Sequence, residues 1–218
     1  MIFGMAKTKP MLKYLLLLLL ALSLPAHAAD SAWGLSELMI ELGRVKQAKG
    51  TFVEKKYLKL LNAPLESSGR LIYTAPHRLE KLTLAPKPES MVVDQDTLTI
   101  EMRGRKRSLQ IQDYPVLWAF VESMRGTLKG DLSALRQFYK VKLEGSRQAW
   151  QLQLQPTDKK MTALIQSIVI RGSKDRMNVI EITEADGDHS EMTVTEEAIS
   201  SAAPETTGIA RTLIDTTS

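Results

Sequence analysis

Apolar and polar residues alternate with a period of two along most of the chain after residue 50. Trp150, Leu152 and Leu154 are interleaved with glutamines, and similar runs cover residues 97–102 and 139–144. Because successive side chains of a β-strand point to opposite faces, this pattern predicts strands with one apolar and one solvated face, which is typical of antiparallel sheets. Turn-forming residues separate about ten such strands. A sheet of this size curls, and its apolar face must be covered.

Two segments that break the alternation are candidates for that cover. Residues 35–45 carry apolar side chains at helical spacing, which predicts one amphipathic helix. Residues 115–121 are apolar on every side and begin with a proline suited to the first helical position, and we expect this helix to run to Met124 and end before Gly126. A short second helix is expected after Gly130. Because a helix that is apolar all round is buried on more than one side, we expect it to lie in the mouth of the curved sheet.

The N-terminus has the pattern of a secretory signal peptide. Three lysines precede an apolar run at residues 15–24, and small residues end the segment at Ala28. The run is half as long as the roughly 20 residues that a membrane-spanning helix needs. Cleavage after Ala28 predicts an exported, periplasmic protein with a single domain at residues 29–197 and a loosely ordered tail at residues 198–218.

Removal of this leader changes the net charge of the protein. The whole chain has 29 basic and 25 acidic residues, a net charge of +4, which suggests nucleic-acid binding as a hypothesis. Three basic residues and no acidic ones lie in the leader, so the remaining 190 residues carry 26 basic and 25 acidic side chains. A net charge of +1 gives no support to a nucleic-acid-binding function.

The densest cluster of charge is formed by Arg103, Arg105, Lys106 and Arg107. It lies between two predicted strands, so the simplest interpretation is a solvated hairpin tip. Such a cluster also suits contact with a phosphate group, an anionic membrane or an anionic partner. The sequence leaves both interpretations open.

Residues that carry catalysis are scarce in this sequence. The chain has no cysteine, which excludes disulfides, thiolate nucleophiles and cysteine-ligated metals. The only histidines after the leader, His77 and His189, lie in predicted turns, and no cluster of metal-ligand residues accompanies them. The sequence also lacks a phosphate-binding loop, a nucleophile elbow and a dinucleotide fingerprint. We therefore expect no enzyme activity, no metal and no cofactor.

The remaining signal is apolar surface. A curled sheet with one apolar face and a helix that is apolar all round together provide more nonpolar surface than a small core requires. One interpretation is a core packed by the helices, and the other is a cavity that takes an apolar ligand. The hydrophobic pattern favours neither.

Three short segments that follow the predicted N-terminal helix are informative through their order and spacing. They are residues 50–54 (GTFVE), 69–79 (GRLIYTAPHRL) and 88–98 (PESMVVDQDTL). In this arrangement the chain resembles the LolA family of periplasmic outer-membrane lipoprotein carriers. The resemblance implies a mainly β fold with some helix, a half-open antiparallel β-barrel covered by the N-terminal helix and by a helical lid at residues 115–138. It also implies a hydrophobic cavity for acyl chains.

The resemblance places the cavity between the sheet and the lid. Two positions depart from the family pattern: Ala75 stands where the family has an arginine that latches the lid, and Lys81 stands where it has a cavity aromatic. These departures indicate a divergent LolA-like branch. Lys81 or Arg78 is a candidate contact for an anionic head group, although a lysine on the solvated face of a strand is the commoner case. The expected cavity residues are Phe52, Leu71, Tyr73, Leu79, Met91, Leu98, Ile100, Leu117, Trp118, Phe120, Val121, Met124, Trp150 and Leu152.

We therefore expect a monomeric periplasmic carrier of a lipoprotein, lipid or glycolipid, with peripheral membrane contact and without catalytic residues. By the resemblance, its partners are the lipidated cargo, an inner-membrane exporter and an outer-membrane acceptor. Two alternatives remain from the sequence: a periplasmic regulatory module that senses lipids or lipoproteins, and an accessory subunit of an acyltransferase or exporter system.

Overall fold

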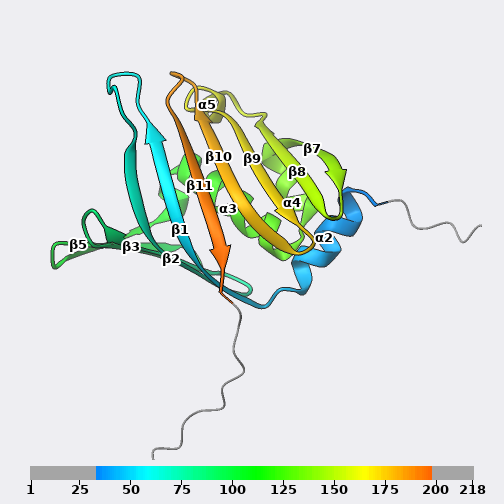
Figure 1. Cartoon of the computed structure of the whole chain (residues 1–218), viewed down its shortest axis with the longest axis horizontal. Helices are drawn as coiled ribbons and strands as arrows, with labels where there is room; N and C mark the ends of the chain where they lie inside the picture. The colour runs from blue at the N-terminus through cyan, green and yellow to red at the C-terminus, as the bar shows by residue number, and fades with distance from the viewer. Residues whose placement is uncertain (1–32, 198–218) are drawn as a thin grey trace, which may run out of the picture. The chain divides into compact units, whose positions relative to one another are not determined.

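The computed structural model of the protein describes residues 33–197 and is drawn in Figure 1. The predicted signal peptide at residues 1–28 and the predicted tail at residues 198–218 lie outside the described residues. From Gly34 onward, the described residues belong to one compact unit. None of their helices is long and apolar enough to cross a membrane.

A single antiparallel sheet contains the eleven strands of the described residues. Strands β1 to β6 follow one another toward one edge, and β7 to β11 return from the other edge until β11 pairs with β1. The edge strands β6 and β7 do not pair, so the sheet stays open and the prediction of a mainly β, half-open antiparallel architecture is confirmed. The strands are β1 (Gln47–Tyr57), β2 (Leu65–Thr74), β3 (Arg78–Ala85), β4 (Glu89–Asp94), β5 (Thr97–Met102), β6 (Arg105–Gln110), β7 (Tyr139–Ser146), β8 (Ala149–Pro156), β9 (Ile165–Ser173), β10 (Arg176–Glu184) and β11 (His189–Glu196).

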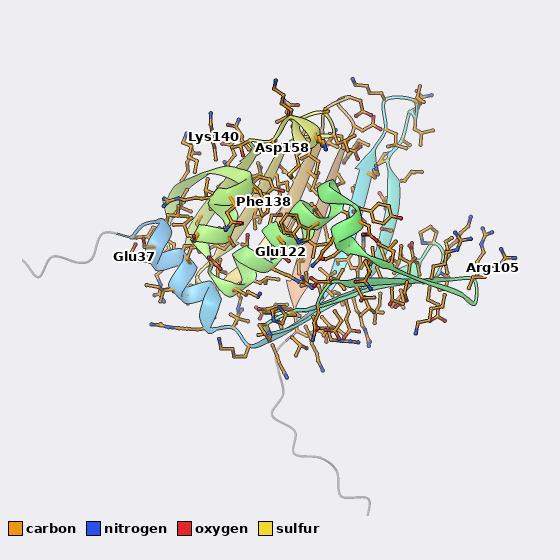
Figure 2. All side chains as sticks on the ribbon, turned by 180° about the vertical axis from the view of Figure 1, so that it is seen from behind. Glu37, Arg105, Glu122, Phe138, Lys140 and Asp158 are labelled. Carbon is orange, nitrogen blue, oxygen red and sulfur yellow. The ribbon has the colours of Figure 1, made fainter. Side chains whose placement is uncertain are left out.

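Most of the helical residues come before the sheet or between its two series of strands, and one short helix lies within the second series. Helix α2 precedes β1, a short 3-10 turn and helices α3 and α4 connect β6 to β7, and α5 connects β8 to β9. Figures 1 and 2 show α3 and α4 lying against one face of the sheet, which we call the inner face. The helices are α2 (Leu35–Arg44), the turn η1 (Ile111–Asp113), α3 (Pro115–Lys129), α4 (Leu132–Phe138) and α5 (Lys159–Thr162).

Helix α3 is longer than the sequence predicted. The expected end before Gly126 is wrong, because this glycine lies inside the helix where α4 approaches closely: a Cβ there would be 3.2 Å from the side chain of Leu135. The helix ends instead at Gly130, whose φ of 69° is the left-handed conformation that favours glycine. A side chain on Gly130 would also overlap the carbonyl oxygen of Met39 in α2, so this glycine lets α2 and α3 meet.

The strand register determines which side chains share the inner face. Residues directly opposite each other in an antiparallel pair point to the same side. One row of partners crosses the sheet as Ala48, Tyr73, Leu79, Val93, Leu98 and Leu109. The next row is Gly50, Leu71, Lys81, Met91, Ile100 and Arg107.

The other half of the inner face forms a tightly packed core. Leu152, Leu154, Ile168 and Ile170 of β8 and β9 have no solvent exposure. Their partners across the sheet continue the apolar face, with Ile170 opposite both Leu152 and Ile180. These four residues are therefore the fully buried part of this half, whereas Ile180 of β10 is only partly buried.

Candidate functional site

Seven of the predicted cavity residues, from β3, β4, β5 and α3, gather in one apolar cluster, which we call the inner cluster. It contains the predicted residues Leu79, Met91, Leu98, Ile100, Leu117, Trp118 and Val121. It also contains Val93, Leu109 and Ile111, which the sequence analysis did not select. Val93 and Leu109 belong to the same alternating pattern as their neighbours, so the register could have identified them.

The inner cluster is sealed at its centre and open at its margin. Ile111 and Leu98 are buried, with exposed fractions of 0% and 4%. Leu79, Met91 and Ile100 on the sheet are only partly buried, as are Leu117 and Trp118 on the lid. The margin of the cluster is therefore an apolar wall with a helix laid on it.

Aromatic packing joins the two helices of the lid. The ring of Trp118 in α3 meets the ring of Phe138 edge to face, with centroids 5.0 Å apart and planes at 86°. Phe120 and Met124, the other predicted lid residues, are partly buried in α3. Any movement of α3 away from the sheet must therefore take α4 along or break this aromatic contact.

The remaining predicted cavity residues lie on the inner face in different surroundings. Phe52 and Tyr73 are buried, and burial raises the pKa of the Tyr73 phenol. Leu71 is partly buried in the same row as Met91. Trp150 is 2% exposed and its indole N–H donates to the carbonyl of Lys174 at 2.9 Å, which fixes it in the other half of the sheet together with Leu152. The structure thus does not bring Trp150 and Leu152 into the inner cluster.

Lys81 lies on the inner face, where it is already paired. Its ammonium nitrogen is 2.5 Å from a carboxylate oxygen of Glu54 and 5.0 Å from the centroid of the Phe52 ring. The hydroxyl of Ser67 donates to the same carboxylate oxygen at 3.2 Å. The Lys81 and Glu54 side chains are 27% and 21% exposed. An anionic head group could approach Lys81 only in competition with Glu54.

Arg78 lies on the opposite face from Lys81. It is the neighbour of Leu79 along β3, and its guanidinium contacts Glu80 at 2.8 Å and Asp94 at 2.9 Å. These carboxylates raise the pKa of Arg78, with the hydrogen bond to Glu80 as the largest cause. Of the two predicted head-group contacts, the structure places Lys81 alone beside the apolar wall.

A buried arginine ties the lid to the sheet. Arg125 of α3 is 2% exposed, and its guanidinium donates to the carbonyl of His77 at 2.9 Å and to the carbonyl of Gln95. These carbonyls belong to the β2–β3 and β4–β5 turns. Its other terminal nitrogen contacts the Glu122 carboxylate at 2.8 Å. Arg125 was missed by the sequence analysis, although a single arginine in a helix that faces an apolar sheet is a signal worth testing.

Arg125 on the lid takes the place of the latch arginine that position 75 lacks. Ala75 has no side-chain donor, and its backbone N–H donates to the carbonyl of Lys46 at 2.9 Å. Two residues later, His77 supplies one of the carbonyls that Arg125 binds. In this protein the donor is Arg125 on the lid and the acceptor is a carbonyl of the β2–β3 turn. An arginine at position 75 would reverse the roles, because the donor would then lie on the turn.

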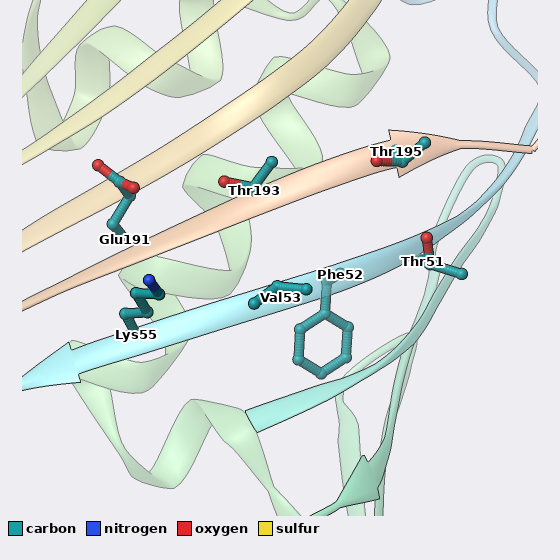
Figure 3. A pocket seen from close by; sticks show the side chains of 7 residues that line it. All are labelled: Thr51, Phe52, Val53, Lys55, Glu191, Thr193 and Thr195. Carbon is teal, nitrogen blue, oxygen red and sulfur yellow. The ribbon is translucent and has the colours of Figure 1, made fainter. Parts of the chain in front are cut away.

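The outer face of the sheet carries a shallow groove of about 310 Å³ between β1 and β11 (Figure 3). Its walls are made by cross-strand pairs such as Val53 with Thr193 and Lys55 with Glu191. Beyond its end, Tyr57 stacks on His189 with ring centroids 4.5 Å apart. The groove is lined by both polar and apolar side chains, and no group of acidic residues and histidines in the described part of the chain could hold a metal ion.

Comparison with known proteins identifies the family. No curated protein sequence matches the chain. Among solved structures, a LolA superfamily protein from Nitrosomonas europaea is 9% identical with a TM-score of 0.42, over 75% of this chain and 92% of that one. The MucA/MucB complex from Pseudomonas aeruginosa gives 19% identity and a TM-score of 0.44, over 75% of this chain and 57% of that one. The family model described as outer membrane lipoprotein carrier protein LolA-like matches residues 24–217, and the chain therefore belongs to this LolA-like family.

Proposed function

We propose that the protein is a periplasmic carrier that binds acyl chains of a lipoprotein or lipid on the inner face of its sheet and does not transform them. The inner cluster is the observation that carries this proposal, because its apolar wall is only partly buried where α3 covers it. Membership of the LolA-like family supports the periplasmic location and a lipidated ligand.

Hydrophobic contact supplies the affinity in this proposal. Leu79, Met91 and Ile100 of the sheet and Leu117 and Trp118 of the lid all pack against the buried residues at the centre of the inner cluster. An acyl chain that replaced these lid side chains and buried about 300 Å² would gain roughly 7 kcal/mol at about 25 cal/mol per Å², before ordering costs. That corresponds to micromolar or weaker affinity. A carrier that must release its cargo needs affinity of this order.

The proposed partners follow from the direction of transport. An inner-membrane exporter would supply the lipidated cargo, and an outer-membrane acceptor would receive it from the monomeric carrier. The transfer makes and breaks no covalent bond, so it needs no catalytic residue, metal or cofactor. Lys81 is the proposed contact of an anionic head group, which would have to displace Glu54 from its ion pair with this lysine.

Uptake of a fluorescent fatty acid by the mature protein tests the proposal. We expect Trp118→Glu to weaken uptake at least tenfold, because the charge would enter the apolar contact between lid and wall. Ile40→Glu is the matched control, because Ile40 is 57% exposed on α2, outside the inner cluster. Thermal unfolding of both variants shows whether the fold is intact.

A milder substitution keeps the test informative if Trp118→Glu unfolds. Met91→Ser shortens the sheet wall without adding charge and should weaken uptake several-fold. Absence of uptake by the unmodified protein would contradict the proposal. Folded Trp118 and Met91 variants that take up as much fatty acid as the unmodified protein would contradict it as well. Native mass spectrometry of protein purified from the periplasm without detergent adds an independent readout, for which we expect heterogeneous acylated adducts.

A further inference from the structure

Two turns meet at the outer end of the sheet half formed by β3 to β6. Thr83 pairs with Glu89, Glu89 with Met102, and Met102 with Arg105, so the β3–β4 and β5–β6 turns lie side by side. Figure 2 shows Arg105 at this end, far from Glu122 and Phe138 of the lid. We call this end the basic tip, and define it by Lys87, Arg103, Arg105, Lys106 and Arg107.

The positive charges of the basic tip are exposed and uncompensated. All five side chains are exposed, and none forms an ion pair with another described residue. Among the acidic residues on the strands that flank these turns, Glu89 and Glu101 lie nearest to the tip. Elsewhere in the domain, arginines such as Arg78 and Arg171 are neutralised by carboxylates. The tip therefore has excess positive charge that the fold itself does not use.

Apolar side chains accompany these charges. Leu84 is 60% exposed and Met102 is 47% exposed, next to the two turns. Arg105 and Arg107 share the face of Met102 and Ile100, whereas Lys106 points to the other face with Glu101. Cations thus lie on both faces of the β5–β6 hairpin, and the exposed Met102 lies directly opposite Arg105.

We propose that the basic tip is a docking surface for an anionic phospholipid bilayer, approached end-on. A membrane interface favours this combination, because lysine and arginine contact phosphate head groups while short apolar side chains enter the boundary of the acyl region. Cations that point to both sides of one hairpin suit a fluid surface that surrounds the tip. A folded protein partner would instead need a surface of complementary shape. The proposal goes beyond acyl-chain binding, since it concerns where the protein meets the membrane.

Co-sedimentation with lipid vesicles tests the docking surface. The mature protein is mixed at low salt with vesicles of phosphatidylcholine alone or of phosphatidylcholine with phosphatidylglycerol. Each basic side chain near an anionic surface strengthens binding about fivefold. Replacing Lys87, Arg103, Arg105 and Lys106 by glutamine should therefore weaken binding to the anionic vesicles by more than about 100-fold.

A control variant removes the same number of charges elsewhere. Arg136, Lys140, Lys159 and Lys160 are exposed and form no ion pair with a described residue, so their replacement by glutamine lowers the net charge equally. We expect this variant to keep most of the binding. Replacement of Leu84 and Met102 by glutamine should cause a smaller loss of several-fold that persists at high salt.

The outcomes separate docking from its rivals and from the proposed carrier function. Equal losses in the tip and control variants would show a net-charge effect and overturn the proposal. Equal binding to neutral and anionic vesicles, or no vesicle binding at all, would overturn it as well, and in the latter case an acidic protein becomes the partner to seek. Fatty-acid uptake by the tip variant should match that of the unmodified protein, so failure of docking leaves the carrier proposal standing.

Discussion

Replacement of Arg125 by methionine should release the lid. The guanidinium makes two hydrogen bonds to turn carbonyls, those of His77 and Gln95. A hydrogen bond from a charged donor contributes about 1.5–3 kcal/mol, and the desolvation of a buried charge offsets part of the sum. About 3 kcal/mol then remains in favour of the closed lid, which corresponds to roughly a hundredfold shift toward opening. Methionine keeps much of the side-chain volume, so the change isolates the polar contacts.

Amide hydrogen exchange measures this shift directly. In Arg125→Met, exchange of the α3 amides should accelerate up to about a hundredfold, while the amides of β8 and β9 keep their protection. Stopped-flow uptake of a fluorescent fatty acid should accelerate in parallel. Arg171→Met is the matched control, because Arg171 pairs with Glu181 on the outer face of the sheet, away from the lid and its turns. We expect it to leave exchange in α3 unchanged.

Two outcomes would refute the role of Arg125 as a tie between lid and sheet. Exchange that rises equally in α3 and in β8 and β9 would show that the residue supports the stability of the whole domain. Unchanged exchange in α3 would show that apolar packing alone holds the lid. A second substitution tests whether a donor on the turn can replace the donor on the lid. When Ala75→Arg is added to Arg125→Met, the new guanidinium should donate to the lid and slow the release of the fatty acid compared with Arg125→Met alone.

Two further predictions concern the ion pairs of the sheet. Lys81→Met should lower the free energy of unfolding by about 1 kcal/mol, because Glu54 loses its partner on the inner face, and adding Glu54→Gln should recover most of the loss in urea denaturation. Arg171 lowers the pKa of Glu181, so the stability from this pair is present above the unfolded pKa and is lost as pH falls through the folded pKa. The melting temperature of Glu181→Gln should accordingly fall less steeply than that of the unmodified protein between about pH 6 and pH 3.

The period-two pattern was enough to predict the apolar wall. Leu98 and Ile100 alternate with polar residues along β5, and the structure places both on the inner face with Met91. The pairing order was not available from the same pattern. Alternation shows that a strand has an apolar face, whereas the meeting of β1 with β11 depends on contacts between distant parts of the chain.

Polar contacts of the site were harder to predict than its apolar surface. The Lys81 ammonium depends on Glu54, which lies on a strand two positions away in the sheet, so neither residue reveals the other in the sequence. Arg125 likewise contacts carbonyls from two turns, and a backbone acceptor leaves no trace in the residue type. The absence of an arginine at position 75 indicated a missing latch. Only the tertiary structure reveals that Arg125 of the lid supplies the donor instead.

The unequal burial of the two halves of the inner face constrains how the lid can open. Leu152 and Ile170 are completely buried, so exposing that half would forfeit a large apolar contact. Leu79 and Ile100 are partly buried already, so moving the lid away from their half exposes less apolar surface, and the two bonds of Arg125 to its turns are the polar contacts that must break. Opening is therefore least costly if the first part of α3 leaves β3 to β6 while the other half stays packed. An acyl chain should consequently contact Met91 and Ile100 and leave Trp150 untouched.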